Sequence, residues 1–292
     1  MNHFEFTGPA FLVFYLVFST LVIVSLVVAR RLAESSHPPK IDLSDPYLIA
    51  YLRGDAPEAL RVATVSLIDR GLLVATGSRI KCADNASIAS VRRPIEKELL
   101  RKFKTADEAT SIYEDRGLLA TCKPYELTLE DAGLLPSEDI QRARLTRLLL
   151  ACFLLGSVGL VKIFLALESG HTNVVFLVLL MIAAIVVAAK VSFPRLTERG
   201  KAMIADLRNL YSGLKDRAPS LQAGGAAVEP MMLAAVFGVG ALTTASFASA
   251  QTLFPRATRE QSSSSCASAG SSCGSSCGGD GGCGGGCGGC GG

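Results

Sequence analysis

Six cysteines near the C-terminal end are the residues of this sequence with the clearest capacity for chemistry. They are Cys266, Cys273, Cys277, Cys283, Cys287 and Cys290, and the last two form a C-x-x-C pair. Thiolates at short spacings can ligate soft metals such as Zn²⁺ or Cu(I), and four of them could close a site. The sequence therefore predicts a candidate metal site at these cysteines, with Zn or Cu(I) as its cofactor.

The residues between these cysteines favour a second interpretation, a tail with free thiols. In segment 261–292 all but four of the 32 positions are Gly, Ser or Cys, and none is Lys or Arg. Such a composition buries too little apolar surface to offset its chain entropy, and it has no side chains that would orient metal ligands. We expect 261–292 to be a disordered, low-complexity tail, whose thiols would stay reduced inside a cell and could oxidise outside it.

The rest of the sequence has no arrangement of residues typical of an enzyme. The three histidines, His3, His37 and His171, have neither the spacing of a zinc helix nor a nucleophile motif beside them, and there is no P-loop. Gly238-Val-Gly240 lacks the third glycine and the strand-turn-helix context of a dinucleotide site. We predict a non-enzymatic protein without catalytic residues. The remaining cysteines are isolated and are expected to be small buried apolar groups: Cys82, Cys122 and Cys152.

The composition of the 292 residues is typical of a membrane protein, with 49% hydrophobic residues, 19% charged residues and a mean hydropathy of +0.38. Three apolar runs, 11–29, 148–167 and 174–193, have about the length that crosses a hydrocarbon core of roughly 30 Å. The first run could be a signal peptide, but it lacks a preceding Lys or Arg and exceeds the usual length of about 7–15 residues, which favours an anchor. We therefore predict three transmembrane helices, the last two forming a hairpin.

Basic residues beside these runs predict the orientation. They are Arg30, Arg31 and Lys40 after the first run, Arg142, Arg144 and Arg147 before the second, and Lys190, Arg195, Arg199 and Lys201 at or after the end of the third. The N-terminal segment 1–10 and the hairpin loop contain no Lys or Arg. By the positive-inside rule the N-terminus lies outside, and segments 31–147 and 194–230 are cytoplasmic.

A fourth uncharged run, 231–254, is rich in Ala, Gly, Ser and Thr and is only weakly hydrophobic. It leaves two alternatives open, a fourth transmembrane helix or a helix that lies at the interface or packs against protein. A spanning helix would place Arg256 and Arg259 outside, against the charge rule. The choice between these alternatives decides on which side of the membrane the tail lies.

Segment 31–147 has 18 basic and 18 acidic residues, so it lacks the basic excess that nonspecific nucleic-acid binding requires. It contains a short echo, Asp69-Arg-Gly-Leu-Leu73 and Asp115-Arg-Gly-Leu-Leu119. We expect both glycines to end helices in a left-handed cap and both leucine pairs to begin strands. A helix that leads through Asp-Arg-Gly into a strand resembles the junction between recognition helix and wing in winged-helix domains. For the echo itself, two similar helix ends are a simpler explanation than a duplicated domain.

Four shorter helices are also expected from their first residues. Asp45 caps a helix from Pro46 to Leu52, and Pro94 opens one over 95–103. Thr105 begins a capping-box pattern for a helix that reaches Glu114. The fourth, 197–210, places Met203, Leu207 and Leu210 on one face, which we expect to pack against segment 31–147 or to lie along the membrane surface.

Five segments together resemble an uncharacterised family of bacterial membrane proteins. They are Phe4-Glu-Phe-Thr-Gly-Pro-Ala-Phe-Leu, Asp45-Pro-Tyr-Leu-Ile-Ala-Tyr-Leu-Arg-Gly54, Leu67-Ile-Asp-Arg-Gly-Leu-Leu73, Leu196-Thr-Glu-Arg-Gly-Lys-Ala and the Gly/Ser/Cys tail. The resemblance covers nearly the whole chain in this order. It implies a bacterial plasma-membrane protein with an N-terminal anchor, a helical cytoplasmic region, a membrane hairpin and a cysteine-rich terminus, and it carries no catalytic residue.

We therefore predict a mainly α membrane protein with three or four transmembrane helices, a small α+β, winged-helix-like cytoplasmic domain and a disordered tail. Its partners are expected to be the lipid bilayer and a protein that binds the cytoplasmic domain, and no nucleic acid is expected as a partner. The predicted function is a non-enzymatic interaction or scaffold role. The alternative is redox or soft-metal handling by the tail thiols. The third candidate function is membrane-tethered nucleic-acid binding.

Overall fold

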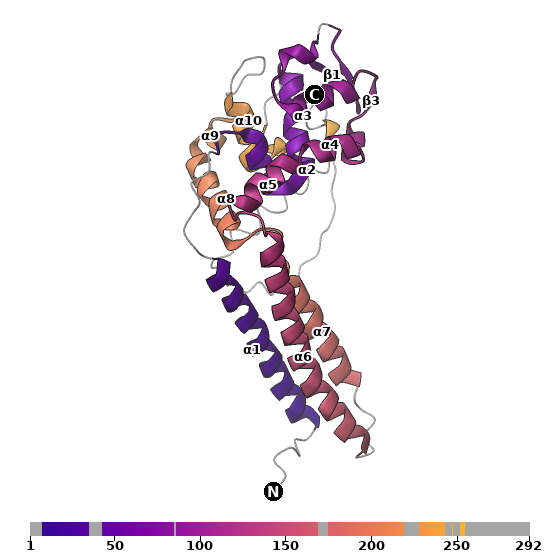
Figure 1. The fold of residues 1–292 in the computed structure, drawn as a ribbon, viewed down its shortest axis with the longest axis vertical. Helices are drawn as coiled ribbons and strands as arrows, with labels where there is room; N and C mark the ends of the chain where they lie inside the picture. Colours follow the sequence, from indigo (N-terminus) through magenta and orange to yellow (C-terminus); the bar gives the residue numbers. More distant parts are fainter. Residues whose placement is uncertain are drawn as a thin grey trace, which may run out of the picture.

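The protein consists of a three-helix stalk with a helical domain at one end (Figure 1). The computed structural model describes residues 8–34, 43–84, 86–168, 175–218, 228–242, 247 and 252–254. The stalk contains α1 (Gly8–Glu34), α6 (Glu138–Glu168) and α7 (Val175–Ser192). The N-terminal end of α1 lies at the far end of the stalk from the domain.

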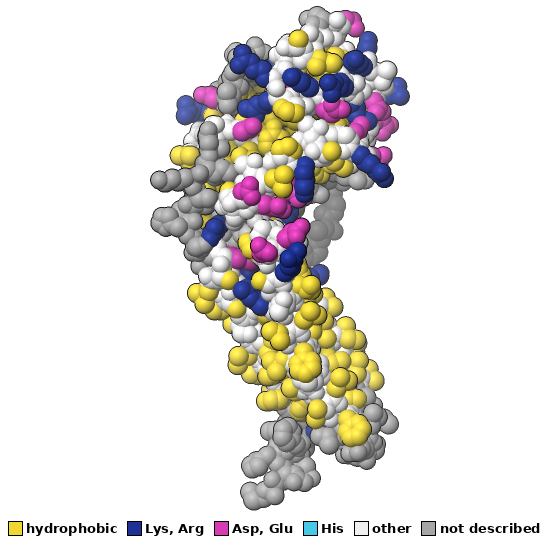
Figure 2. All heavy atoms as spheres, in the orientation of Figure 1, with side chains coloured by type: hydrophobic (Ala, Val, Ile, Leu, Met, Phe, Trp, Pro, Cys, Tyr) yellow, Lys and Arg dark blue, Asp and Glu magenta, His cyan; other side chains and the backbone are white. Residues whose placement is uncertain are grey.

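Each stalk helix corresponds to one of the three apolar runs and is long and apolar enough to cross a membrane. Large apolar side chains cover the outside of the stalk (Figure 2), and Phe153, for example, is 76% exposed. Between the helices the chain buries Phe11, Tyr15 and Leu155. The Tyr15 hydroxyl donates a hydrogen bond of 3.0 Å to the Leu155 carbonyl, so this buried polar group is satisfied within the bundle.

The domain is built around α2 (Pro46–Asp69), of which 17 of the 24 residues are buried. The helix starts at the predicted residue, because the Asp45 carboxylate accepts a 2.9 Å hydrogen bond from the Tyr47 amide. It continues to Asp69 with a kink at Gly54 and Asp55. Around it pack α3 (Pro94–Lys102), α4 (Arg116–Thr121), α5 (Lys123–Asp131), α8 (Glu198–Leu210), α9 (Ser212–Asp216) and α10 (Val228–Phe237).

A small antiparallel sheet with the order β1-β2-β3 lies beside these helices. Its strands are β1 (Leu73–Thr76), β2 (Arg79–Cys82) and β3 (Asp107–Glu108), with Leu73 opposite Cys82 and Ile80 opposite Asp107. The strand expected after Gly71 is β1, and it forms a hairpin with β2. The helix before this hairpin is enclosed by its neighbours, however, so α2 has no free face that could enter a nucleic-acid groove.

Two of the expected short helices are confirmed in the remainder of the chain. One is α3, which begins at Pro94, and the other is α8, whose cap Thr197 accepts a 3.1 Å hydrogen bond from the Gly200 amide. Leu207 of α8 is buried in the domain core and Met203 packs against that core, which confirms packing on the domain; Leu210, in contrast, is exposed. Contacts between α8 and the domain therefore involve only part of the predicted face.

The helix predicted from Thr105 to Glu114 is wrong. Residues Asp107 and Glu108 form β3, and a 3₁₀ segment, Ala109–Tyr113, follows. The helix indicated by the capping-box pattern does not form, because β3 pairs with β2 and completes the sheet, with Glu108 opposite Arg79. The Asp107 carboxylate also accepts a 2.9 Å hydrogen bond from the Ser111 hydroxyl, which stabilises the tighter turn.

The second copy of the Asp-Arg-Gly-Leu-Leu echo also differs from its prediction. Gly71 has φ +69° and ends α2 before β1, as expected. Gly117, in contrast, lies inside α4 and has no positive φ, and Leu118 and Leu119 are helical. The reason is that Asp115 caps the start of α4, where its carboxylate accepts hydrogen bonds from the Gly117 and Leu118 amides.

Of the fourth apolar run, 231–254, the structure describes 231–242, 247 and 252–254, and residues 231–242 follow the protein-packed alternative. Its helix α10 has ten residues, about 15 Å or half a hydrocarbon core, and ends before Gly238, which has φ +98°. Leu233, Ala234 and Ala235 are completely buried in the domain core. The small residues of this run therefore serve close packing against α2, where Arg53 Nε donates a 2.9 Å hydrogen bond to the Ala235 carbonyl.

Candidate functional site

On the face drawn in Figure 2, charged side chains become frequent where the stalk meets the domain. Figure 2 shows hydrophobic side chains over most of the stalk and charged side chains from this level onward. We call this region the junction and define it by Arg30, Glu34, Arg144, Arg195, Thr197 and Glu198. All six lie within or directly beyond an end of a stalk helix.

The centre of the junction is a buried ion pair between Glu34 of α1 and Arg144 of α6. Both side chains are 3% exposed, and Arg144 Nε donates a 2.8 Å hydrogen bond to Glu34 Oε1. Arg144 Nη1 also donates a 2.8 Å hydrogen bond to the Pro194 carbonyl after α7. One arginine thus joins all three stalk helices at the level where the chain passes into the domain.

Arg30 makes a second set of bonds at the same level. Its Nη1 donates to the Val191 carbonyl and its Nη2 to Glu198 Oε1, each at 2.6 Å. Glu198 also accepts a 2.8 Å hydrogen bond from Lys201 Nζ, and this bond, with the neighbouring Arg30 charge, lowers the pKa of Glu198. The Glu198 amide in turn donates to Glu34 Oε2 at 3.3 Å, which connects the two ion pairs.

The segment between α7 and α8 extends these bonds into the domain. Arg195 donates hydrogen bonds of 2.6 and 2.9 Å to the Tyr51 and Leu52 carbonyls, which precede the kink in α2. Thr197 Oγ1 donates to the Gly133 and Leu134 carbonyls at 2.8 and 3.0 Å. A Cβ at Gly200 would run into the Leu134 carbonyl oxygen, so glycine allows this close approach of α8.

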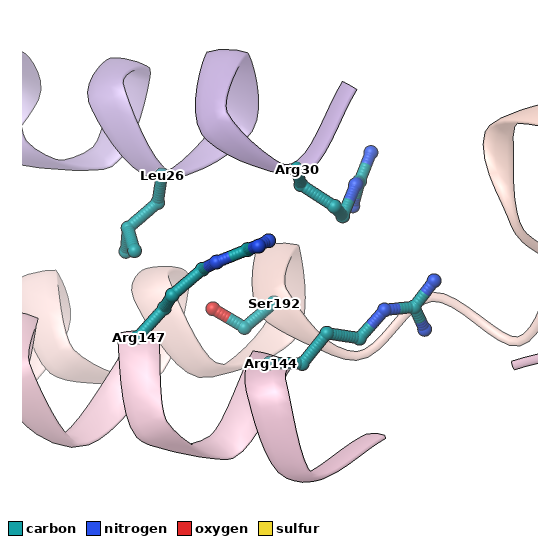
Figure 3. Close-up of a pocket in the computed structure, with 5 residues that line it drawn as sticks. All are labelled: Leu26, Arg30, Arg144, Arg147 and Ser192. Carbon is teal, nitrogen blue, oxygen red and sulfur yellow. The ribbon is translucent and has the colours of Figure 1, made fainter. Parts of the chain in front are cut away.

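A small hollow between the stalk helices lies beside the buried ion pairs. It is lined by Leu26, Arg30, Arg144, Arg147 and Ser192 (Figure 3). Its volume is about 10 Å³, enough for a group the size of one water molecule. Three of its five lining residues are arginines, so the hollow is suited to an anion rather than to a cation.

The described residues do not contain a cluster of three or more His, Cys, Asp or Glu side chains that could hold a metal ion. The six cysteines of the predicted metal site, Cys266 to Cys290, all lie outside the described residues, so this metal site stays a prediction. Of the other cysteines, Cys122 is buried as expected, whereas Cys82 and Cys152 are partly exposed. Burial raises the pKa of the Cys122 thiol to about 12, which makes it unreactive.

Comparisons with protein families, curated proteins and solved structures found no match for this chain. From the sequence, the arginines of the junction predict only the orientation of the helices, and not the ion pairs and hydrogen bonds that they form. The signal that could have identified their partners is the pair of lone acidic residues, Glu34 and Glu198, each a few residues beyond such a run.

Proposed function

We propose that this chain is an integral protein of a bacterial plasma membrane that holds a non-enzymatic interaction domain at the cytoplasmic face. Its three stalk helices would cross the bilayer with the N-terminus outside. The observation that supports this proposal most directly is the continuous set of hydrogen bonds and ion pairs across the junction. A domain on a flexible tether would not require these bonds. A domain that is held in one fixed orientation relative to the stalk does require them.

The energetics of the junction favour one fixed pose. Burying a carboxylate and a guanidinium is costly, and removing one partner of such a pair typically destabilises a protein by about 3–5 kcal/mol. Glu34 and Arg144 therefore stabilise the arrangement in which they meet and penalise any arrangement that separates them. Arg195 and Thr197 transmit this preference to the domain through their hydrogen bonds to backbone carbonyls.

The charge distribution supports the orientation. Arg30 lies near the end of α1, and Arg144 and Arg147 lie near the start of α6, so all three are at the domain end of the stalk (Figure 1). By the positive-inside rule this end is expected to be cytoplasmic. Phe254, the last residue that the structure describes, is buried in the domain core beside Tyr113. Segment 255–292 contains no apolar run that could cross a membrane, so this proposal also places the six tail cysteines in the cytoplasm.

The topology is tested with a membrane-impermeant maleimide on intact bacterial cells that express the full chain. The tail cysteines are expected to react only after the cells are permeabilised. Asn2→Cys in a chain whose six tail cysteines are serine is the matched control, because it places a thiol on the outer side and is expected to react in intact cells. Labelling of the tail in intact cells would contradict the proposed topology.

The interaction role is tested with a photo-reactive amino acid at exposed apolar positions of the domain, each in a separate protein. Val74, Leu127 and Leu210 are suitable because they are 51%, 50% and 75% exposed. In membranes we expect an adduct of constant mass from at least one position, and a weaker adduct when Glu34→Gln is added to the same chain. Glu138→Gln is the control, because Glu138 pairs with Arg142 on the surface. No discrete adduct from any position would contradict an interaction function.

A further inference from the structure

The hollow between the stalk helices contains an arginine whose charge is not paired. Arg144 pairs with Glu34 and Arg30 pairs with Glu198. In the part of the chain that the structure describes, no ion pair or hydrogen bond involves the guanidinium of Arg147. Figure 3 shows this side chain extending between the helices toward Arg30, while the Arg144 side chain points away from it.

Arg30 adds an unsatisfied donor beside Arg147. Arg30 is 8% exposed, and its Nε is buried without a hydrogen-bond acceptor among the described residues, although both of its terminal nitrogens are satisfied. A buried donor without an acceptor costs about 1–3 kcal/mol, so such a group calls for a partner. Ser192 Oγ does not need one, because it donates a 2.8 Å hydrogen bond to the Ala188 carbonyl. The unmet requirement of the hollow is therefore an acceptor with negative charge.

The position of the hollow along the stalk indicates where that acceptor comes from. Arg30 follows the first apolar run directly, Arg147 precedes the second directly, and Ser192 is the last residue of α7. In a spanning stalk, these three positions lie at the level of the lipid headgroups. A phosphodiester at that level carries one negative charge and several acceptor oxygens, which matches one unpaired guanidinium and one unpaired Nε.

We propose that Arg147 and Arg30 bind the phosphate group of an anionic phospholipid in this hollow. The hollow, with its volume of about 10 Å³, admits one phosphate oxygen, while the rest of the headgroup stays outside it and the acyl chains lie against the apolar stalk. Bound there, the lipid would complete the charge balance between α1, α6 and α7. This inference rests on the proposed membrane insertion of the stalk.

The test uses the delipidated full chain in micelles of a neutral detergent, with bound lipids counted by native mass spectrometry. Dioleoyl phosphatidylglycerol is titrated, and dioleoyl phosphatidylcholine is the zwitterionic comparison. We expect one phosphatidylglycerol to bind to the wild type at concentrations at which phosphatidylcholine is not retained. Arg147→Gln is expected to weaken this binding about tenfold, because it removes a charge-assisted contact.

Arg142→Gln is the matched control, since Arg142 lies on the same helix with the same charge but pairs with Glu138 on the surface. It is expected to change lipid binding by no more than about twofold. Equal weakening by both substitutions, or no retained phosphatidylglycerol in the wild type, would overturn the proposal and indicate that the hollow holds only water. Circular dichroism of both variants checks that they are folded.

Inorganic phosphate is titrated separately to identify the source of the phosphate group. Displacement of phosphatidylglycerol only by another anionic lipid supports the lipid assignment. Binding of inorganic phosphate in place of lipid, with the same dependence on Arg147, would overturn that assignment in favour of a soluble anion. Washing membranes with alkaline carbonate separates this inference from the proposed function. Release of the chain from the membrane would show that it is not an integral protein and would contradict the proposed function. A chain that stays in the membrane but binds no phosphatidylglycerol would refute only the lipid site.

Discussion

The same five residues, Asp-Arg-Gly-Leu-Leu, end one helix and begin another in this protein. In the first copy, Asp69 is the last residue of α2, Gly71 is left-handed and Leu73 starts β1. In the second copy, Asp115 precedes α4 and the glycine and both leucines are helical. A short sequence therefore does not determine its own structure, and what precedes each copy decides between the two outcomes.

The hydrogen bonds explain the difference between the copies. The first copy follows a helix with unpaired carbonyls, and it satisfies them by a Schellman arrangement in which the Gly71 and Leu72 amides donate to Ile68 and Leu67, each at 2.9 Å. The second copy follows a 3₁₀ turn, so no long helix needs to be ended. There the Asp115 carboxylate instead accepts from the Gly117 and Leu118 amides at 2.9 and 3.2 Å.

The two copies also bury different leucines, and this gives the largest expected effect. Leu73 in the first copy and Leu118 in the second are 1% and 0% exposed, whereas Leu72 and Leu119 are only partly buried. Leu73→Ala and Leu118→Ala are each expected to lower the free energy of unfolding by about 2–5 kcal/mol. Urea unfolding of the full chain in detergent micelles, followed by circular dichroism, measures this change.

Leu72→Ala and Leu119→Ala are the controls for this prediction and are expected to cost clearly less than their neighbours. The ranking must therefore be reversed between the copies, with the second leucine dominant in the first copy and the first leucine dominant in the second. Equal rankings in both copies would mean that the copies have the same local structure.

The two glycines give the next largest difference. Gly71→Ala places a Cβ at φ +69° and is expected to cost about 1–2 kcal/mol. Gly117→Ala is expected to change the free energy of unfolding by less than about 0.5 kcal/mol, because its gain in helix propensity is offset by a 3.2 Å contact with Asp115 Oδ1. Both are measured by the same unfolding experiment, and a cost at Gly117 as large as that at Gly71 would argue against the helical second copy.

The stalk could be predicted from the sequence far better than the second copy or the junction. An apolar run of membrane length indicates a helix without knowledge of its neighbours, and all three such runs are helical in the structure. In the segment that begins at Thr105, Asp107 and Glu108 form a strand only because β2 lies beside them. The partners in the junction are still harder to predict, since Arg144 lies 110 residues from Glu34 and Arg30 lies 168 residues from Glu198.

Removal of the Asp115 cap is expected to have a smaller effect than the leucine substitutions. Asp115→Ala leaves the first amides of α4 without an acceptor and is expected to cost about 1 kcal/mol. Asp115→Asn is the matched variant, because asparagine caps helices about as well but has no charge for Lys102, whose Nζ lies 3.1 Å from Asp115 Oδ2. An equally large loss in both variants would assign the effect to the ion pair and not to the cap.

The pH dependence of these variants gives the smallest expected effect. Desolvation of the Asp115 carboxylate opposes its ionisation, but hydrogen bonds from the Leu118 amide, from Lys102 and from the Gly117 amide outweigh it and hold the pKa of Asp115 below its ordinary value. The ionised carboxylate therefore stabilises the fold above the unfolded pKa of about 4, and this contribution is lost as the pH falls through the lower folded pKa. The difference in stability between wild type and Asp115→Asn, measured in urea from pH 6 to pH 3, is expected to shrink below pH 4. A difference that stays constant over this range would show that the charge of Asp115 does not contribute to the start of α4.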